Sequence, residues 1–161
     1  MKKLYAILNH LSVLTKLNIY SYTESNDPHF VAEFIPKPKT LLDFNLRSFK
    51  ANHGEFYIED HDMVVYTDET SLSYLVTRCQ VIEDESLVII GPFLLENPGS
   101  RSFTELGQHD NFSSEDDSSL LDYYSHLKIL DLEYLYALSG LLSILLNRQV
   151  IDPKIHFLKC E

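Results

Sequence analysis

The segment between Asp131 and Arg148 constrains the fold most, because it predicts a helix that is apolar around more than half of its circumference. Asp131 can cap the first turn, and Asn147 and Arg148 end the apolar run. At 3.6 residues per turn, the leucines form two rows that point about a quarter-turn apart. The apolar arc is about 200° wide, whereas a single core contact needs a stripe of roughly 100°. This closing helix, residues 131–147, is therefore expected to pack against two partners.

Two interpretations fit the closing helix. It is either a central core helix surrounded by its own domain, or it packs on its own sheet with one side and on a second copy of the chain with the other. The second interpretation gives candidate residues for a homodimer interface, which are Leu132, Tyr134, Leu135, Leu138, Leu141, Leu142 and Leu145.

Length and composition indicate one soluble globular domain over residues 1–161. A formal net charge of −11 argues against nucleic-acid binding by these residues, because such surfaces need clustered Lys and Arg. The two cysteines, Cys79 and Cys160, lie far apart and are expected to be free thiols in a reducing compartment. The sequence offers no signal peptide and no apolar run of the ~20 residues that a membrane span needs. We therefore expect a cytoplasmic protein without membrane contact.

The first half of the chain predicts two helices around a pair of strands. Apolar residues at helical spacing indicate a helix over residues 2–17. Alternating side chains indicate a strand at residues 19–23 and a second strand at residues 30–35. Residues 40–49 predict another helix.

The middle of the chain predicts an antiparallel meander that completes a sheet over residues 19–91. Connections as short as these force antiparallel pairing, because a parallel crossover needs about a dozen residues. Gly91 and Pro92 are expected to stop the last strand, since proline cannot donate to the ladder. The expected strands are residues 55–59, 63–67, 72–82 and 87–90.

Two polar segments lie outside these elements. Residues 97–119 are rich in Ser, Asp and Asn, and form either an acidic loop or the lead-in to a short helix through Leu120, Leu121 and Tyr124. Residues 150–161 are expected to be a tail that begins a linker. The order of elements predicts an α+β fold with a single antiparallel sheet and flanking helices, as in PAS-like and GAF-like sensor domains.

Three stretches carry a family resemblance. The first runs from Thr15 to Tyr20, with Asn18 where a proline is usual. The second joins residues 73–75 to residues 88–94 and ends in Gly-Pro-Phe, and the third is the closing helix. Together they resemble the amino-terminal sensory domain of AraC-type transcription regulators from Gram-positive bacteria.

The resemblance implies that DNA is contacted only by a carboxy-terminal pair of helix-turn-helix motifs, which these residues lack. It also implies a homodimer that senses a small-molecule or protein effector. We therefore expect the sensing and dimerising half of such a regulator. A stand-alone protein-interaction module without a small-molecule ligand is the alternative, and a small enzyme is a third possibility.

Tyrosines on the predicted strands give a candidate ligand pocket. A tyrosine has a large apolar body and a polar tip, so several on one face can line a pocket for a small amphipathic or aromatic molecule. They can equally be ordinary strand residues, which sheets favour. The candidates are Tyr20, Tyr22, Tyr57, Tyr66 and Tyr74, with Phe93.

Catalytic, metal and cofactor sites are not expected. The seven histidines are dispersed, and no pair of them has a compact zinc-ligand spacing with a cysteine nearby. The run Asp60-His61-Asp62 could hold a cation or titrate, but a solvated hairpin turn is the simpler interpretation. Cys79 could sense redox state, but a buried strand cysteine is simpler. No serine has the flanking glycines of a nucleophile elbow, and no phosphate-cradling glycine loop is present, so we expect neither an enzyme nor a cofactor.

Overall fold

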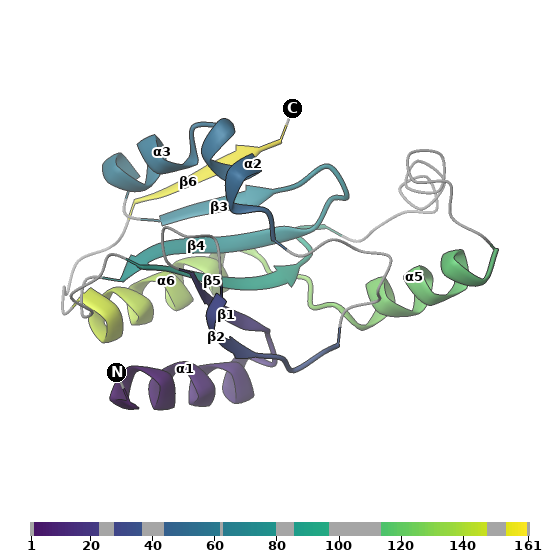
Figure 1. Cartoon of the computed structure of the whole chain (residues 1–161), viewed down its shortest axis with the longest axis horizontal. Helices are drawn as coiled ribbons and strands as arrows, with labels where there is room; N and C mark the ends of the chain where they lie inside the picture. The colour runs from purple at the N-terminus through teal and green to yellow at the C-terminus, as the bar shows by residue number, and fades with distance from the viewer. Residues whose placement is uncertain are drawn as a thin grey trace.

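The computed structural model describes residues 2–22, 28–36, 44–61, 63–79, 86–96, 114–147 and 154–160. These residues form an α+β fold with one open sheet of six strands (Figure 1). The helices are α1 (Lys2–Thr15), α2 (Leu46–Ala51), α3 (Gly54–His61), α5 (Ser114–His126) and α6 (Leu132–Asn147). The strands are β1 (Ile19–Tyr22), β2 (Pro28–Ala32), β3 (Met63–Thr67), β4 (Ser73–Cys79), β5 (Ser86–Phe93) and β6 (Ile155–Lys159).

The sheet has the strand order β2-β1-β5-β4-β3-β6. The meander of β3, β4 and β5 is antiparallel, as predicted, and β1 pairs antiparallel with both β2 and β5. The prediction of a wholly antiparallel sheet is wrong at one edge, because β6 runs parallel to β3. The sheet is therefore mixed, and β2 and β6 are its edge strands.

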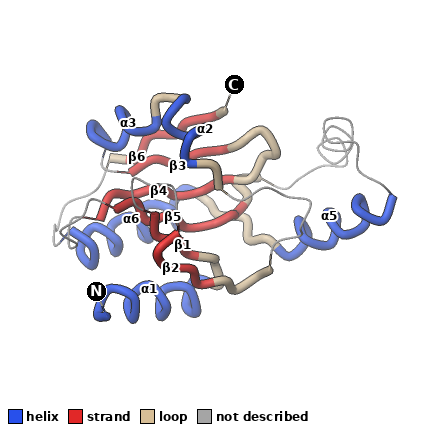
Figure 2. Tube along the Cα trace, viewed as in Figure 1, coloured by secondary structure: helices blue, strands red, loops and turns tan. Residues whose placement is uncertain are grey.

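Helices cover both faces of the sheet (Figure 2). Helices α1 and α6 pack on one face, which we call the α6 side, over strand residues such as Ile19, Val65 and Ile90. Helices α2, α3 and the second half of α5 pack on the opposite face, which we call the tyrosine side. Successive strand residues point alternately to the two faces, so each face of the sheet contributes side chains to its own hydrophobic core.

The connection between β3 and β4 is a turn that the Asp68 side chain fixes. The Asp68 carboxylate accepts hydrogen bonds from the backbone N–H groups of Thr70 (2.9 Å) and Leu72 (3.1 Å). The Tyr124 hydroxyl donates to the carbonyl oxygen of Thr70 at 2.6 Å. The turn is therefore fixed both by its own side chain and by α5.

The strand predicted at residues 55–59 is wrong, because these residues belong to α3. His53 takes a left-handed φ of 65°, which ends α2, and its carbonyl oxygen accepts the first helical bond from the Tyr57 N–H. Residues 60 and 61 complete this helix rather than a hairpin turn, and residue 62 lies outside the described residues. A five-residue run with two apolar side chains fits both periods, so the pattern alone could not separate strand from helix.

Other boundaries differ from the predictions. The helix predicted at residues 40–49 is observed as α2, and residues 40–43 lie outside the described residues. The Asn45 side chain caps α2 by accepting a hydrogen bond from the Ser48 N–H at 3.0 Å. Within the segment predicted as an acidic loop, residues from 114 onward form α5, so the helical alternative is confirmed there, and residues 97–113 lie outside the described residues. The segment predicted as a linker contains β6, whose side chains reach both cores.

The expected strand stop at Gly91 and Pro92 is also wrong, because β5 continues through both residues to Phe93. Gly91 has a φ of +140°, and its N–H donates to the carbonyl oxygen of Asn18 at 2.9 Å. A Cβ at this position would lie 2.8 Å from the carbonyl oxygen of Ser73. Glycine is needed here because β4 and β5 approach closely where their register shifts.

Candidate interaction surface

The start of α6 is fixed by its cap and by the end of β5. As predicted, the Asp131 carboxylate accepts a hydrogen bond from the Tyr134 N–H at 2.8 Å. The Leu130 N–H donates to the carbonyl oxygen of Leu94, and the Leu94 N–H donates to that of Lys128, both at 2.8 Å. These bonds fix both the first turn of α6 and the strand-like segment that precedes it.

One row of leucines on α6 faces the chain's own sheet. Leu135, Leu138, Leu142 and Leu146 are buried in the core on the α6 side. Three of the predicted dimer-interface residues are therefore core residues: Leu135, Leu138 and Leu142. Ser139 and Ser143 are buried on the same helix, and the Ser139 hydroxyl has no hydrogen-bond partner among the described residues.

A second set of apolar side chains on α6 faces outward. Of the predicted interface residues, Leu132 is 58% exposed and Leu141 is 45% exposed, whereas Tyr134 and Leu145 are partly buried against the core. Tyr136 and Ile144 are 49% and 47% exposed, and the prediction missed them. Their four-residue spacing from Leu132 and Gly140 was the signal that could have found them.

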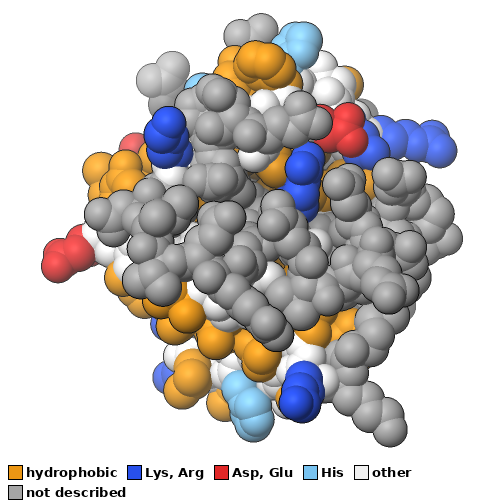
Figure 3. Space-filling view, turned by 90° about the vertical axis from the view of Figure 1, so that its left-hand side faces the viewer, with side chains coloured by type: hydrophobic (Ala, Val, Ile, Leu, Met, Phe, Trp, Pro, Cys, Tyr) orange, Lys and Arg blue, Asp and Glu red, His pale blue; other side chains and the backbone are white. Residues whose placement is uncertain are grey.

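We call this surface the outward face of α6; it comprises Leu132, Tyr136, Ala137, Gly140, Leu141 and Ile144. Figure 3 views the molecule from the left-hand side of Figure 1, and hydrophobic side chains show both near the top and in the lower half of this view. Singly exposed apolar residues are normal on a protein surface, but a row of them along one helix makes this face a candidate interaction surface.

Gly140 lies near the middle of the outward face. A Cβ at this position would meet no atom of the described residues within 4 Å, so no contact among them requires glycine here. Glycine in a helix interior is about 1 kcal/mol less favourable than alanine. The outward face therefore contains a residue that weakens the isolated helix and keeps its surface low at that point.

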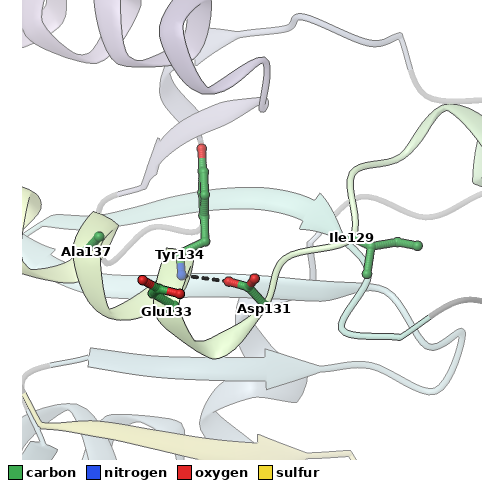
Figure 4. A pocket seen from close by; sticks show the side chains of 5 residues that line it. All are labelled: Ile129, Asp131, Glu133, Tyr134 and Ala137. Atoms are coloured by element: carbon green, nitrogen blue, oxygen red, sulfur yellow. Dashed lines mark hydrogen bonds between the residues drawn. The ribbon is translucent and has the colours of Figure 1, made fainter.

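A recess of about 330 Å³ flanks the first turns of α6 (Figure 4). It is lined by Ile129, Asp131, Glu133, Tyr134 and Ala137. The Tyr134 ring extends away from the helix (Figure 4). Burial raises the pKa of the Tyr134 hydroxyl. The Lys128 ammonium lies 5.7 Å from the centroid of the same ring. The recess gives the outward face one acidic corner.

The candidate pocket residues do not all lie together. Tyr20, Tyr22, Tyr66 and Tyr74 share the tyrosine side of the sheet, as predicted for a single face, whereas Phe93 lies on the α6 side. Tyr57 is on α3 rather than on a strand, and its ring stacks on that of His156 at 3.7 Å.

The four strand tyrosines belong to a packed aromatic cluster. Phe44 lies edge-on to Tyr74 at 5.2 Å and to Tyr66 at 6.1 Å, between ring centroids. The Ser48 and Tyr66 hydroxyls are 3.1 Å apart, and the Asn18 side-chain amide donates to the Tyr20 hydroxyl at 3.2 Å. Burial raises the pKa of Tyr66 to about 12 and that of Tyr74 well above its ordinary value. These are features of a core.

The described residues also bear on metal sites, reactive thiols and membrane contact. Within the described part of the chain, no three His, Cys, Asp or Glu side chains are grouped so that they could hold a metal ion. Cys79 is fully buried on the α6 side of β4, and Cys160 is partly buried at the end of β6. No helix of the described residues is long and apolar enough to cross a membrane.

Comparison with known proteins adds no relative: no protein-family model, no curated protein and no solved structure matches the chain.

Proposed function

We propose that this chain is the sensing and dimerising domain of an AraC-type transcription regulator, and that a second copy packs on the outward face of α6. The observation that carries the proposal is that α6 has apolar side chains on two sides, of which one is buried and the other is exposed. One row of its leucines fills the chain's own core, while Leu132, Tyr136, Leu141 and Ile144 stay about half exposed.

The chemistry of the outward face favours a second copy as the occupant. The chain has a formal net charge of −11, so two copies repel each other wherever their carboxylates come close. Between Tyr134 and Asn147 the helix carries no charged residue. Two copies can therefore pair along the stretch from Tyr136 to Ile144 without burying a charge, provided that the exposed Glu133 in the first turn stays at the edge of the contact.

Burial of the outward face is large enough to matter. Complete burial of a leucine, isoleucine or similar side chain stabilises by roughly 1.5–3 kcal/mol, so covering the exposed half contributes about 1 kcal/mol per residue. In a two-fold pair each of these residues is buried once in each copy, so its contribution counts twice. The sum must still exceed the entropic cost of association, and this is why a single lost leucine is expected to be measurable.

The regulatory part of the proposal is supported by the order of elements. A helix, a strand pair, two short helices, a three-strand meander and two further helices come in the order expected for PAS-like and GAF-like sensors, and the chain then adds β6. In β4, Tyr74 faces the tyrosine side and Leu75 faces the α6 side. An effector that shifts Tyr74 would therefore displace a neighbour of the core on which α6 packs, and would change the population of α6 arrangements.

The alternative is a protein-interaction module without a small-molecule ligand. The close packing of the aromatic cluster on the tyrosine side favours it, since those rings already contact each other. This alternative uses the same outward face for a different protein.

Two observations test the proposal. Light scattering on the 161-residue chain at tens of micromolar is expected to give the mass of a dimer, and a monomer would overturn the proposed dimerisation. Codons beyond Glu161 that encode a basic helix-turn-helix domain would support the regulator, whereas a stop codon there would favour the alternative.

A further inference from the structure

We propose that β6 is a releasable strand, which opens from β3 as one unit while the rest of the sheet stays folded, and which side chains on the tyrosine side hold closed. This inference goes beyond the proposed function, because it concerns a single chain and does not need a second copy. It gives the tyrosine side an output at the sheet edge that is separate from α6.

The first argument is how little of β6 is buried. Each residue from Ile155 to Lys159 is at least partly exposed, and Phe157 is 42% exposed. In contrast, the residues from Met63 to Tyr66 on the neighbouring strand β3 are buried. Strand β6 has one neighbour only, and parallel pairing is slightly less stable per residue than antiparallel pairing. Segments with few buried apolar contacts open at a lower free energy than the core does.

The opposite edge of the sheet is held by a buried side chain. Just after β2, the backbone N–H groups of Phe34 and Ile35 donate to the Asn18 side-chain oxygen. The Asn18 side-chain amide donates to the carbonyl oxygen of Ile35 at 2.9 Å. Asn18 directly precedes β1, so these bonds tie the end of one strand to the start of the next. Release is therefore expected at β6 rather than at β2.

Two contacts on the tyrosine side hold β6 closed. The His156 ring stacks on the Tyr57 ring of α3, with a centroid distance of 3.7 Å and an interplanar angle of 10°. The Cys160 thiol accepts from the Asn52 side-chain amide at 3.7 Å, and it also shares a hydrogen bond with the Tyr66 side chain. Figure 1 shows β6 at the edge of the sheet, next to α2 and α3. Both contacts are lost when β6 leaves β3.

Tyr66 connects the end of β6 to the aromatic cluster. Its ring lies edge-on to that of Phe44 at 6.1 Å and to that of Phe49 at 5.5 Å. Its hydroxyl lies 3.1 Å from that of Ser48 and contacts Cys160. A molecule that rearranges the cluster would therefore move a hydroxyl that holds β6, and would change the population of the open strand. Under the proposed function the DNA-binding part follows β6 in the chain, so release of β6 would lengthen the connection to it.

Native-state hydrogen exchange on the full chain tests the inference, followed residue by residue by NMR at increasing sub-denaturing urea. The Cys160 N–H donates to the carbonyl oxygen of Thr67 at 2.8 Å, so it reports on the end of β6. The amides of β4 report on the centre of the sheet. We expect the amides of β6 that pair with β3 to share one protection factor, roughly 100-fold or more below that of β4. Their protection should also depend less steeply on urea, because less surface is exposed when only β6 opens.

Two outcomes would overturn the inference. Equal protection in β6 and β4 would make β6 an integral strand of the sheet. Protection that decreases residue by residue toward Cys160 would show fraying of the chain end rather than release of a unit. Neither outcome depends on the mass found by light scattering, so failure of this inference and failure of the proposed dimerisation are distinguishable.

A pair of variants on α3 tests the ring stack. Tyr57→Ala should lower the protection of β6 by about fivefold or more, because it removes the ring that covers His156. Phe56→Ala removes a ring of similar size from the same helix, but that ring is 63% exposed. It should lower the protection of β6 by no more than about twofold. Equal effects of the two substitutions would overturn the role of the stack in holding β6.

A second pair tests the connection to the aromatic cluster. Tyr66→Phe removes the hydroxyl that contacts Cys160 and should lower the protection of β6. Tyr74→Phe removes a hydroxyl of the same cluster on β4, one strand farther from β6, and should leave the protection of β6 unchanged. Unchanged protection of β6 in Tyr66→Phe would overturn the coupling between the cluster and this strand.

Discussion

Leu141 and Leu142 are neighbours in the sequence but point to different sides of α6, since Leu141 is 45% exposed and Leu142 is fully buried. Consecutive residues on a helix point 100° apart, so one side of α6 can hold the core together while the other stays available. The two leucines therefore represent the buried side and the exposed side of α6, and we expect their substitution to have different effects.

Leu142→Ala is expected to lower the free energy of unfolding by about 2–5 kcal/mol, because it leaves a cavity in the core beneath α6. Leu141→Ala should lower it by much less in a chain that is kept monomeric by dilution. Urea denaturation followed by circular dichroism would measure both. Equal losses would contradict the observed separation of the two residues.

Gly140→Ala is expected to stabilise the monomeric chain by about 1 kcal/mol, because alanine is the better helix former and its Cβ enters open space. The measurement is urea unfolding in a background that carries Leu141→Asp, so that dimer formation does not contribute. A loss of stability would show that Gly140 serves a contact within the chain.

Gly91→Ala makes the same chemical change as Gly140→Ala, but it is expected to lower the free energy of unfolding rather than to raise it. Its φ of +140° and the carbonyl oxygen of Ser73, 2.8 Å from a Cβ, should make alanine cost about 1–3 kcal/mol. The same urea titration would detect this cost. A neutral result would mean that β4 and β5 separate easily where their register shifts.

Asn18→Ala is expected to destabilise the fold by about 2–4 kcal/mol. The Asn18 side-chain oxygen accepts from the N–H groups of Phe34 (2.6 Å) and Ile35 (2.9 Å), and the residue is buried. Its removal leaves two backbone donors without partners. As a control, Asn45→Ala removes the exposed cap of α2 and should cost only about 1 kcal/mol.

The free energy of unfolding is expected to fall as the pH rises from 10 towards 12. Burial raises the pKa of Tyr66 from 10.0 to about 12, so in this window the unfolded chain releases the phenol proton while the folded chain keeps it. Because the folded state then binds more protons, stability decreases with pH, and it is unaffected by Tyr66 below pH 10. Tyr66→Phe should make the decrease shallower, and chemical denaturation at several pH values would show whether it does.

The sequence predicted the parts of the fold in which the apolar periodicity agrees with the capping and turn residues at the ends of the element. The cap at Asp131, the length of α6 and its two-sided apolar pattern could all be predicted, as could β1, β3 and β4. These segments are either long or bounded by side chains whose hydrogen bonds have a single local solution.

The remaining errors have physical causes. Phe56 and Ile58 fit both a strand and a helix, and the choice depends on contacts between α3 and β3 that no local pattern contains. Strand β6 forms through pairing with β3, almost a hundred residues earlier, so its short alternating run looked like a tail. Which leucines of α6 face the sheet was also unpredictable, because two rows of similar apolarity compete and the sheet selects one.

Sedimentation equilibrium of Leu141→Asp beside Leu121→Asp tests the central claim most directly. Leu121 lies on α5 and is 47% exposed, so its substitution makes the same chemical change at an equally exposed helical site away from α6. The account predicts a dimer for the wild-type chain and for Leu121→Asp, and a folded monomer for Leu141→Asp. A Leu141→Asp chain that stays dimeric, or a wild-type chain that is monomeric, would contradict it.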